Sequence, residues 1–219
     1  MQLTKFLSVY LIKGDDGDIL IDTGFLFMRR RLFKLLDKHN VKYIILTHAH
    51  LDHVWNAAVL KERYNAKIAI GKKDVKNLDN RLLRSNSIKW YLRPVAGIYN
   101  FGFKVLKQKE IIVDEELEVG ETITKHGITF KIIDLEGHTP GSIGIIDKDN
   151  NLYCGDAILS RFGKVRLTWQ NNDNEKAIET VRKIINSDIN TIFFGHSKPR
   201  NKSELMRLDK IVNEKQEIC

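Results

Sequence analysis

The chain has 219 residues, of which 42% are hydrophobic and 29% are charged, and its formal net charge is +8. This length and composition predict one globular domain over residues 1–219 and exclude a chain that is disordered throughout. The sequence contains neither an apolar run of about 18 residues nor a secretory leader, so we expect no membrane span and a cytoplasmic protein. Only Cys154 and Cys219 are present, which argues against a disulfide framework and a CxxC zinc site.

The positive charge is concentrated in one part of the sequence. Residues 61–110 contain 13 Lys and Arg against 4 Asp and Glu, whereas the rest of the chain is close to neutral. Such a segment is commonly a solvated face that serves solubility, but it can also attract an anionic substrate. Both interpretations stay open from the sequence, and a nucleic-acid partner is not excluded.

The first third of the chain alternates between strand-like and helix-like patterns. Residues 6–24 contain two strand-like runs around a Gly-Asp-Asp-Gly-Asp turn, which predicts a β-hairpin. Apolar spacing then predicts a helix over residues 25–39 and a strand over residues 41–48. The same reasoning predicts a second helix over residues 54–64 and a strand over residues 66–71.

The middle of the chain is the least regular part. Residues 72–109 have a helical first half and a second half interrupted by Pro and Gly, and we interpret them as a candidate lid or substrate-pocket segment. Residues 116–137 and 142–156 then show strand-like runs with Gly, Asp and Asn turns, which predicts antiparallel strands.

The last part of the chain returns to helices and a strand. A helix is expected over residues 173–188, with Asp173 or Asn174 as its cap, followed by a buried strand over residues 189–196 and a charged helix from Ser203 onward. Two sheets with helices outside them fit this order of elements.

Ionisable side chains follow the ends of several strand-like runs, where soluble proteins commonly place functional loops. Buried polar groups need partners once they leave water, so a packed core would not tolerate them alone. Imidazole and carboxylate groups suit zinc, with iron or manganese as alternatives. The seven candidate ligands are His48, His50, Asp52, His53, His138, Asp156 and His196.

Seven donors exceed the four ligands of one tetrahedral zinc ion. If one aspartate bridges, seven side chains can hold two metal ions about 3.5–4 Å apart, with a shared water or hydroxide between them. Two such ions generate hydroxide near neutral pH and polarise a carbonyl or phosphoryl oxygen. The pattern therefore predicts a site for two metal ions.

The motifs "IDTG", "THAHLDH", "GHTPGS", "GDAI" and "FGHS" occur in this order from Asp22 to His196. Together they resemble the metallo-β-lactamase superfamily of binuclear metal hydrolases. The resemblance implies an α+β fold, a four-layer αβ/βα sandwich of two sheets face to face with helices on both outer sides. This architecture agrees with the order of elements predicted above.

The resemblance also implies roles for individual residues. Asp52 is the candidate catalytic residue, expected to orient the hydroxide and to assist proton transfer to the leaving group. Asp22 is expected either to support a metal ligand or to be a plain turn residue. The matching motifs imply one ion held by His48, His50 and His138, a second held by Asp52, His53 and His196, and a bridge through Asp156.

The sequence departs from the family pattern at several positions. The stretch "DHVWN" has Trp55 where relatives usually have glycine, and we expect the indole to pack in the core rather than to narrow the pocket. Asp156 stands where class B1 β-lactamases carry a cysteine ligand, which disfavours that subgroup. Only 23 residues follow His196, which disfavours the substrate of glyoxalase II, whose helical C-terminal region binds glutathione.

Three functional hypotheses follow. The first is hydrolysis of a small ester, lactone or thioester, resembling the lactonase and thioesterase branches of the family. The second is phosphodiester hydrolysis, with the basic segment binding phosphates. The third is a metal-stabilised binding protein without activity. Such a protein would normally have lost some of the metal ligands, whereas all seven candidate ligands are present here. The substrate, the metal in the cell and the oligomeric state are not determined by the sequence.

Overall fold

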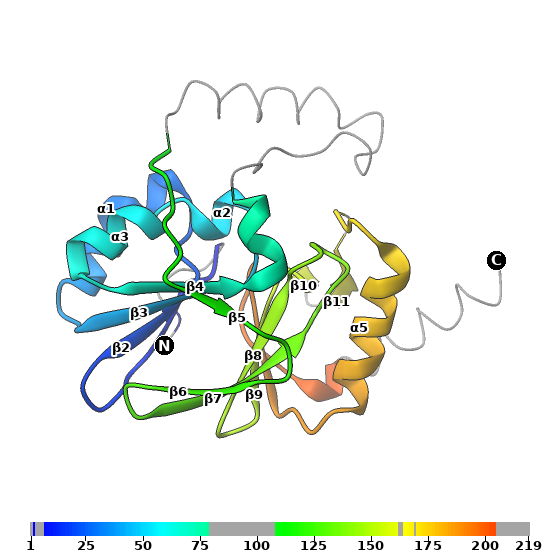
Figure 1. Cartoon of the computed structure of the whole chain (residues 1–219). Helices are drawn as coiled ribbons and strands as arrows, with labels where there is room; N and C mark the ends of the chain where they lie inside the picture. The colour runs from blue at the N-terminus through cyan, green and yellow to red at the C-terminus, as the bar shows by residue number, and fades with distance from the viewer. Residues whose placement is uncertain (1, 3–6, 79–107, 162–163, 169, 205–219) are drawn as a thin grey trace, which may run out of the picture.

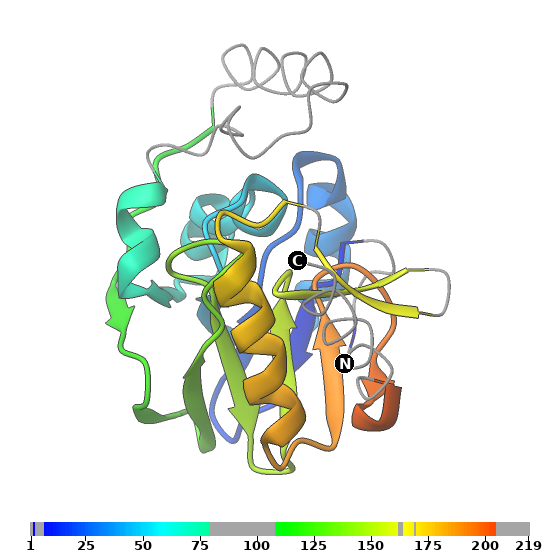
Figure 2. The same ribbon diagram turned by 90° about the vertical axis from the view of Figure 1, so that its right-hand side faces the viewer.

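The computed structural model describes residues 2, 7–78, 108–161, 164–168 and 170–204. These residues form two β-sheets packed face to face, with helices on the outer side of each sheet (Figure 1). The turned view shows one long helix lying across the outer face of the second sheet (Figure 2). The four-layer αβ/βα sandwich predicted from the sequence is therefore confirmed.

The first sheet has five strands, and four of them run parallel. β1 (Tyr10–Ile12) and β2 (Asp18–Ile21) form the predicted antiparallel hairpin, and β3 (Val41–Leu46) and β4 (Lys67–Gly71) follow in parallel. β5 (Glu115–Leu117) pairs in parallel with β4 and ends the sheet. This corrects the expectation of antiparallel strands over residues 116–137 at its first strand, which is parallel to its neighbour.

The helices between these strands differ slightly from the predicted ones. The helix predicted over residues 25–39 consists of the 3-10 turn η1 (Leu26–Met28) and α1 (Arg29–Leu36). The helix predicted over residues 54–64 corresponds to α3 (Ala57–Tyr64), and the short helix α2 (Leu51–Val54) before it was not predicted. Such helical crossovers connect parallel strands of one sheet.

The second sheet has six strands and is mostly antiparallel. β6 to β9 pair antiparallel in sequence, β12 lies parallel to β9, and β13 closes the edge next to β12. The strands are β6 (Thr122–Lys125), β7 (Ile128–Asp134), β8 (Ile143–Asp147), β9 (Asn151–Gly155), β12 (Thr191–Phe194) and β13 (Arg200–Asn201).

The remaining described elements lie outside the two large sheets. β10 (Ile158–Arg161) and β11 (Lys164–Leu167) form a separate hairpin, and η2 (Lys72–Asn77) follows β4 of the first sheet. α5 (Asn174–Asn186) begins where the sequence predicted, because the carboxylate of its cap residue accepts a hydrogen bond from the backbone N–H of Lys176.

Three apolar clusters lie between the four layers. In β3, Ile44 packs toward the helices of the first layer, whereas Ile45 packs between the two sheets. In β9, Leu152 packs toward α5, whereas Tyr153 faces the first sheet. Because both faces of these central strands are buried, their sequences read as continuous apolar runs.

Some predictions lie outside the described residues. The candidate lid is described only at residues 72–78 and 108–109. The charged helix expected from Ser203 onward is described only at its first two residues, which belong to the 3-10 turn η5 (Lys202–Glu204). Both stay predictions, as does the single domain over residues 1–219. None of the described helices is long and apolar enough to cross a membrane.

Candidate metal centre

The ends of the strands bring the candidate ligands together. The motif "THAHLDH" follows β3 of the first sheet, and Asp22 directly follows β2. In the second sheet, His138, Asp156 and His196 follow β7, β9 and β12, three strands that run in the same direction. The two sheets thus present their strand ends at one shared edge, a common position for binding sites in such folds.

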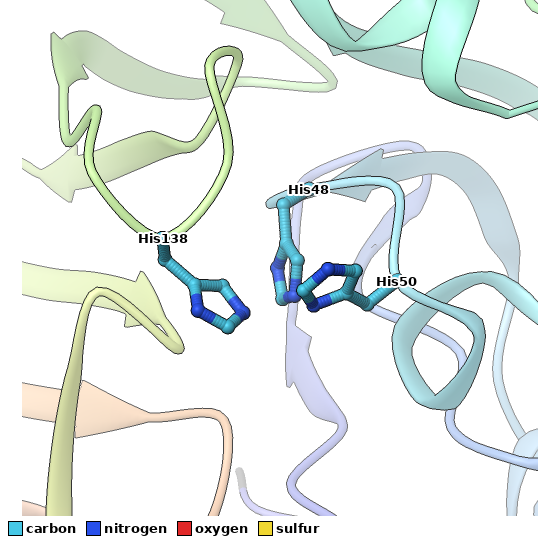
Figure 3. A group of neighbouring side chains, drawn as sticks. All are labelled: His48, His50 and His138. Carbon is cyan, nitrogen blue, oxygen red and sulfur yellow. The ribbon is translucent and has the colours of Figure 1, made fainter. Parts of the chain in front are cut away.

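Three histidines form the first group of candidate ligands. His48 and His50 come from the loop after β3, and His138 comes from the loop between β7 and β8. One ring nitrogen from each lies within 4.8 Å of the others. The three rings point toward one another, and their centroids are 4.5–4.8 Å apart (Figure 3). The structure therefore assembles the first predicted ligand set.

Asp52, His53, Asp156 and His196 form the second group, and their ligand atoms also lie within 4.8 Å of one another. Nε2 of His196 is 3.1 Å from Oδ2 of Asp52 and 3.0 Å from Oδ2 of Asp156. Nε2 of His53 is 3.4 Å from Oδ1 of Asp156. The second predicted set is likewise brought together.

Asp156 lies between the two groups. Besides its contacts in the second group, its Oδ2 is 4.0 Å from Nε2 of His138 in the first group. The rings of His48 and His53, one from each group, have centroids only 4.1 Å apart. A side chain in this position can reach ions held by either group, as bridging requires.

The buried polar atoms of the two groups fit metal ions. Among the described residues, no hydrogen-bond partner is found for Nε2 of His48, Nε2 of His53, both ring nitrogens of His138 or Oδ1 of Asp156. Unpartnered polar atoms are costly to bury and call for a ligand such as an ion. Nitrogen and carboxylate donors in this number suit zinc, iron or manganese.

The histidines of the first group are held in the form that binds metals. Burial holds the pKa of His48 well below its ordinary value and also lowers that of His50. Burial, together with the neighbouring His50, lowers the pKa of His138 to about 3. Because metals bind neutral imidazole, this group needs no deprotonation near neutral pH.

In the second group the pKa values of the histidines are raised, whereas those of the first group are lowered. Burial lowers the pKa of His196, but Asp156 and Asp52 outweigh it and raise the value to about 10. Burial also lowers the pKa of His53, but Asp22 and Asp156 outweigh burial and raise it well above its ordinary value. Burial raises the pKa of Asp52, but His53 and His196 bring it down to about 2. Carboxylates dominate this group and attract cations.

Asp22 supports ligands of both groups. Its Oδ2 is 2.7 Å from Nδ1 of His53, and the carboxylate accepts hydrogen bonds from the backbone N–H and the hydroxyl of Thr47. The Thr47 hydroxyl is in turn 3.0 Å from Nδ1 of His48. Of the two roles expected for Asp22, the structure therefore favours support of a ligand.

The residues after the metal motif pack inward. Trp55 is 2% exposed and its ring centroid is 5.0 Å from that of Phe25, so the expectation of core packing is confirmed. The sequence analysis missed Asn56, whose buried amide donates hydrogen bonds to the backbone oxygens of Thr23, Gly24 and Phe25. Asn56 is the last residue of the stretch "DHVWN", which was its only signal in the sequence. Its side chain joins the "IDTG" loop to the metal motif.

Sequence analysis also missed Asp74. This carboxylate is fully buried in η2 and accepts hydrogen bonds from the loops that carry the first group. Its only sequence signal was an acidic residue just after a strand, inside an otherwise basic segment.

A profile of the metallo-β-lactamase superfamily matches residues 5–196. The chain therefore belongs to this superfamily, and the resemblance predicted from its motifs is confirmed. Members of the superfamily bind divalent metals, and the two groups described above could hold them.

Two relatives are similar to this chain over most of its length. A "probable metallo-hydrolase" of Methanocaldococcus jannaschii is 32% identical over 196 residues, which are 86% of each chain. A "hydroxyacylglutathione hydrolase" of Haemophilus influenzae is 28% identical over 180 residues, 80% of this chain and 78% of that one. The names of these relatives indicate a metallo-hydrolase.

A solved structure agrees with the fold. An archaeal metallo-β-lactamase superfamily protein of Sulfolobus tokodaii superposes with a TM-score of 0.68 and 20% identity, over 94% of this chain and 80% of that one. At this identity the likeness concerns the fold alone.

Proposed function

We propose that this chain is a binuclear metal-dependent hydrolase of small carboxylic esters, lactones or thioesters. The observation that carries the proposal is the pair of adjoining donor groups with unpartnered buried atoms and Asp156 between them. Zinc is the proposed metal, with iron or manganese as alternatives, because the donors are nitrogen and oxygen.

The proposed ligand roles follow the two groups. The first ion would be held by His48, His50 and His138, and the second by Asp52, His53 and His196, with Asp156 shared. When bound, the two ions supply an activated water and polarise the substrate carbonyl.

Asp52 is the proposed catalytic residue. Its side chain is 29% exposed, against 10% for Asp156, so it is the carboxylate of the site that substrate and solvent reach more readily. Its low pKa keeps it ionised near neutral pH, where it can accept a hydrogen bond from an attacking water and orient it.

Among carboxylic substrates, thioesters are the first class to test. The Haemophilus influenzae relative is named for a glutathione thioester, and this chain covers 78% of its length. The short stretch after His196 therefore does not exclude a glutathione thioester as the substrate. The proposed substrate is therefore a small acyl thioester, with esters and lactones as the neighbouring classes.

Phosphodiester hydrolysis is the second candidate, and the described part of the basic segment gives it little support. Six basic side chains there form ion pairs with carboxylates, among them Lys61 with Asp114 at 2.6 Å. Pairing of this kind reduces the positive field available to a polyanion. A metal-stabilised binding protein without activity is the third candidate.

A substrate panel separates these candidates. Metal-loaded protein is assayed with thioesters including a hydroxyacylglutathione, lactones, aryl esters, bis(p-nitrophenyl) phosphate and short RNA. We expect turnover of the carboxylic substrates to exceed that of the phosphodiesters, to be lost in His50→Ala and to be kept in the control His126→Ala, which changes a histidine bonded to Asp16 outside the site. The reverse ranking, with activity that falls steeply as salt rises, would favour the phosphodiesterase. Metal binding without any turnover would favour the binding protein.

A further inference from the structure

A buried carboxylate outside the seven candidate ligands joins the two loops that carry the three histidines. Asp74 is 0% exposed, and its two oxygens accept four hydrogen bonds. Oδ2 accepts from the backbone N–H of Ala49 at 2.9 Å and from the hydroxyl of Thr139 at 2.8 Å. Oδ1 accepts from the backbone N–H of Gly141 at 3.0 Å and from the side chain of Asn77 at 2.8 Å.

Two of these donors lie immediately beside proposed ligands. Ala49 stands between His48 and His50 in the loop after β3, and Thr139 directly follows His138 in the loop after β7. The two loops belong to different sheets, so a single carboxylate links the two sides of the three-histidine group. It does so through backbone and hydroxyl groups and touches no imidazole in these four bonds.

The approach of Asp74 to the second loop leaves no room for a side chain. A Cβ atom on Gly141 would lie 2.3 Å from the backbone nitrogen of Asp74 and 2.6 Å from its Cβ. The same loop is closed on itself, because the hydroxyls of Thr139 and Ser142 are 2.7 Å apart. The last glycine of "GHTPGS" is therefore explained by a tight contact with Asp74.

We propose that Asp74 is a positioning residue, which fixes the distance of His138 from His48 and His50 and so sets the affinity of the three-histidine group for its metal ion. This inference rests on the proposed function, because the spacing of the rings affects affinity only if the group binds metal. None of the four hydrogen bonds goes to the second group, so the effect should be confined to one ion.

The carboxylate is suited to this task because it only accepts hydrogen bonds. An amide of the same shape would turn one of its two acceptors into a donor. That donor would face the N–H of Ala49 or of Gly141 and leave it buried without a partner. Asp74→Asn should therefore loosen one loop while preserving the volume of the side chain.

The experiment is a titration of metal-free protein with Co²⁺, followed by the visible absorption of the bound ion and by competition with a chelator. Asp74→Asn is compared with the wild type and with Asp147→Asn. The control changes a carboxylate that accepts hydrogen bonds from the backbone N–H groups of Asp149 and Asn151, in the turn between β8 and β9. Thermal unfolding is recorded for all three proteins.

We expect Asp74→Asn to weaken one of two Co²⁺ sites about 10–100-fold, as loss of a supporting hydrogen bond typically does, and to leave the other unchanged. Asp147→Asn should keep both sites. In a His196→Ala background, which leaves the three-histidine group intact, Asp74→Asn should weaken the remaining strong site. In a His138→Ala background it should have no further effect.

Two results would overturn the inference alone. One is a wild type with two sites and an Asp74→Asn variant with the same two affinities. The other is an equal loss at both sites, which would indicate a general effect on folding. A wild type that takes up no Co²⁺ would overturn the proposed function as well.

A second variant covers the case in which Asp74→Asn does not fold. Thr139→Val removes only one of the four bonds and should weaken the same site to a smaller extent. Unchanged affinity in that variant would count against the inference.

Discussion

Oδ2 of Asp22 lies 2.7 Å from Nδ1 of His53. This contact fixes the His53 ring so that Nε2 faces Asp52 and Asp156. The same carboxylate also binds Thr47, whose hydroxyl contacts His48. One aspartate at the end of β2 thus orients a proposed ligand in each group.

Asp22→Asn should weaken metal binding about 10–100-fold, because the support of His53 is disturbed. Asparagine is the suitable replacement, since Asp22 has a φ of 59° and Asn tolerates this left-handed conformation. The matched control is Asp18→Asn, which alters another carboxylate–histidine pair, with His39 at 3.2 Å, at the opposite end of β2. Metal affinities from chelator competition check the prediction, and equal losses in both variants would contradict it.

The two carboxylates of the second group should behave differently on truncation. Asp156→Ala removes the side chain between the groups, so metal content and turnover should fall together. Asp52→Ala should mainly empty the second group, and turnover should fall further than metal content because the residue is also proposed to orient the water. Metal analysis and turnover on both variants test this, and full retention of both ions in Asp156→Ala would remove it from the bridging position.

Two histidines of the candidate site, His138 and His196, should titrate far from their ordinary pKa in the metal-free protein. The pKa of His138 is lowered to about 3, so its ring should stay neutral as the pH falls from 8 to about 5. The pKa of His196 is raised to about 10, so its ring should stay protonated up to about pH 9. Ring chemical shifts followed by NMR measure both, and a midpoint near 6.5 for either ring would show that its neighbours do not act as described.

The cap of α5 should contribute to stability independently of the site. Asp173→Ala removes the acceptor for the N–H of Lys176 and should lower the free energy of unfolding by about 1 kcal/mol. Glu179→Ala, at an exposed position of the same helix, should change it by less than about 0.5 kcal/mol. Denaturant unfolding of both variants measures the difference, and equal effects would argue against a capping contribution.

Local sequence patterns were sufficient for most of the fold. The apolar runs of β2 and β3 and the helical spacing of α5 depend on neighbours a few residues apart, which a sequence displays directly. The start of α3 was predicted at residue 54 rather than at Ala57, because helical spacing continues through Asn56, whose side chain is instead bound to the loop at residues 23–25. The parallel pairing of β5 with β4 depends on a partner more than 40 residues away, which no local pattern reveals.

The candidate site shows the same limit. The seven candidate ligands could be named because they recur at strand ends in a recognisable order. Asp74 could not be, because three of its four donors come from two distant loops that meet it only in the folded chain. In sequence it is one acidic residue among lysines.

The metal content of the purified protein tests the central claim most directly. Protein prepared without chelator should contain about two transition-metal ions per chain, and His50→Ala should lower this number because an imidazole ligand is lost. Protein that contains no such metal, and that takes up no zinc, iron or manganese on reconstitution, would contradict the binuclear account.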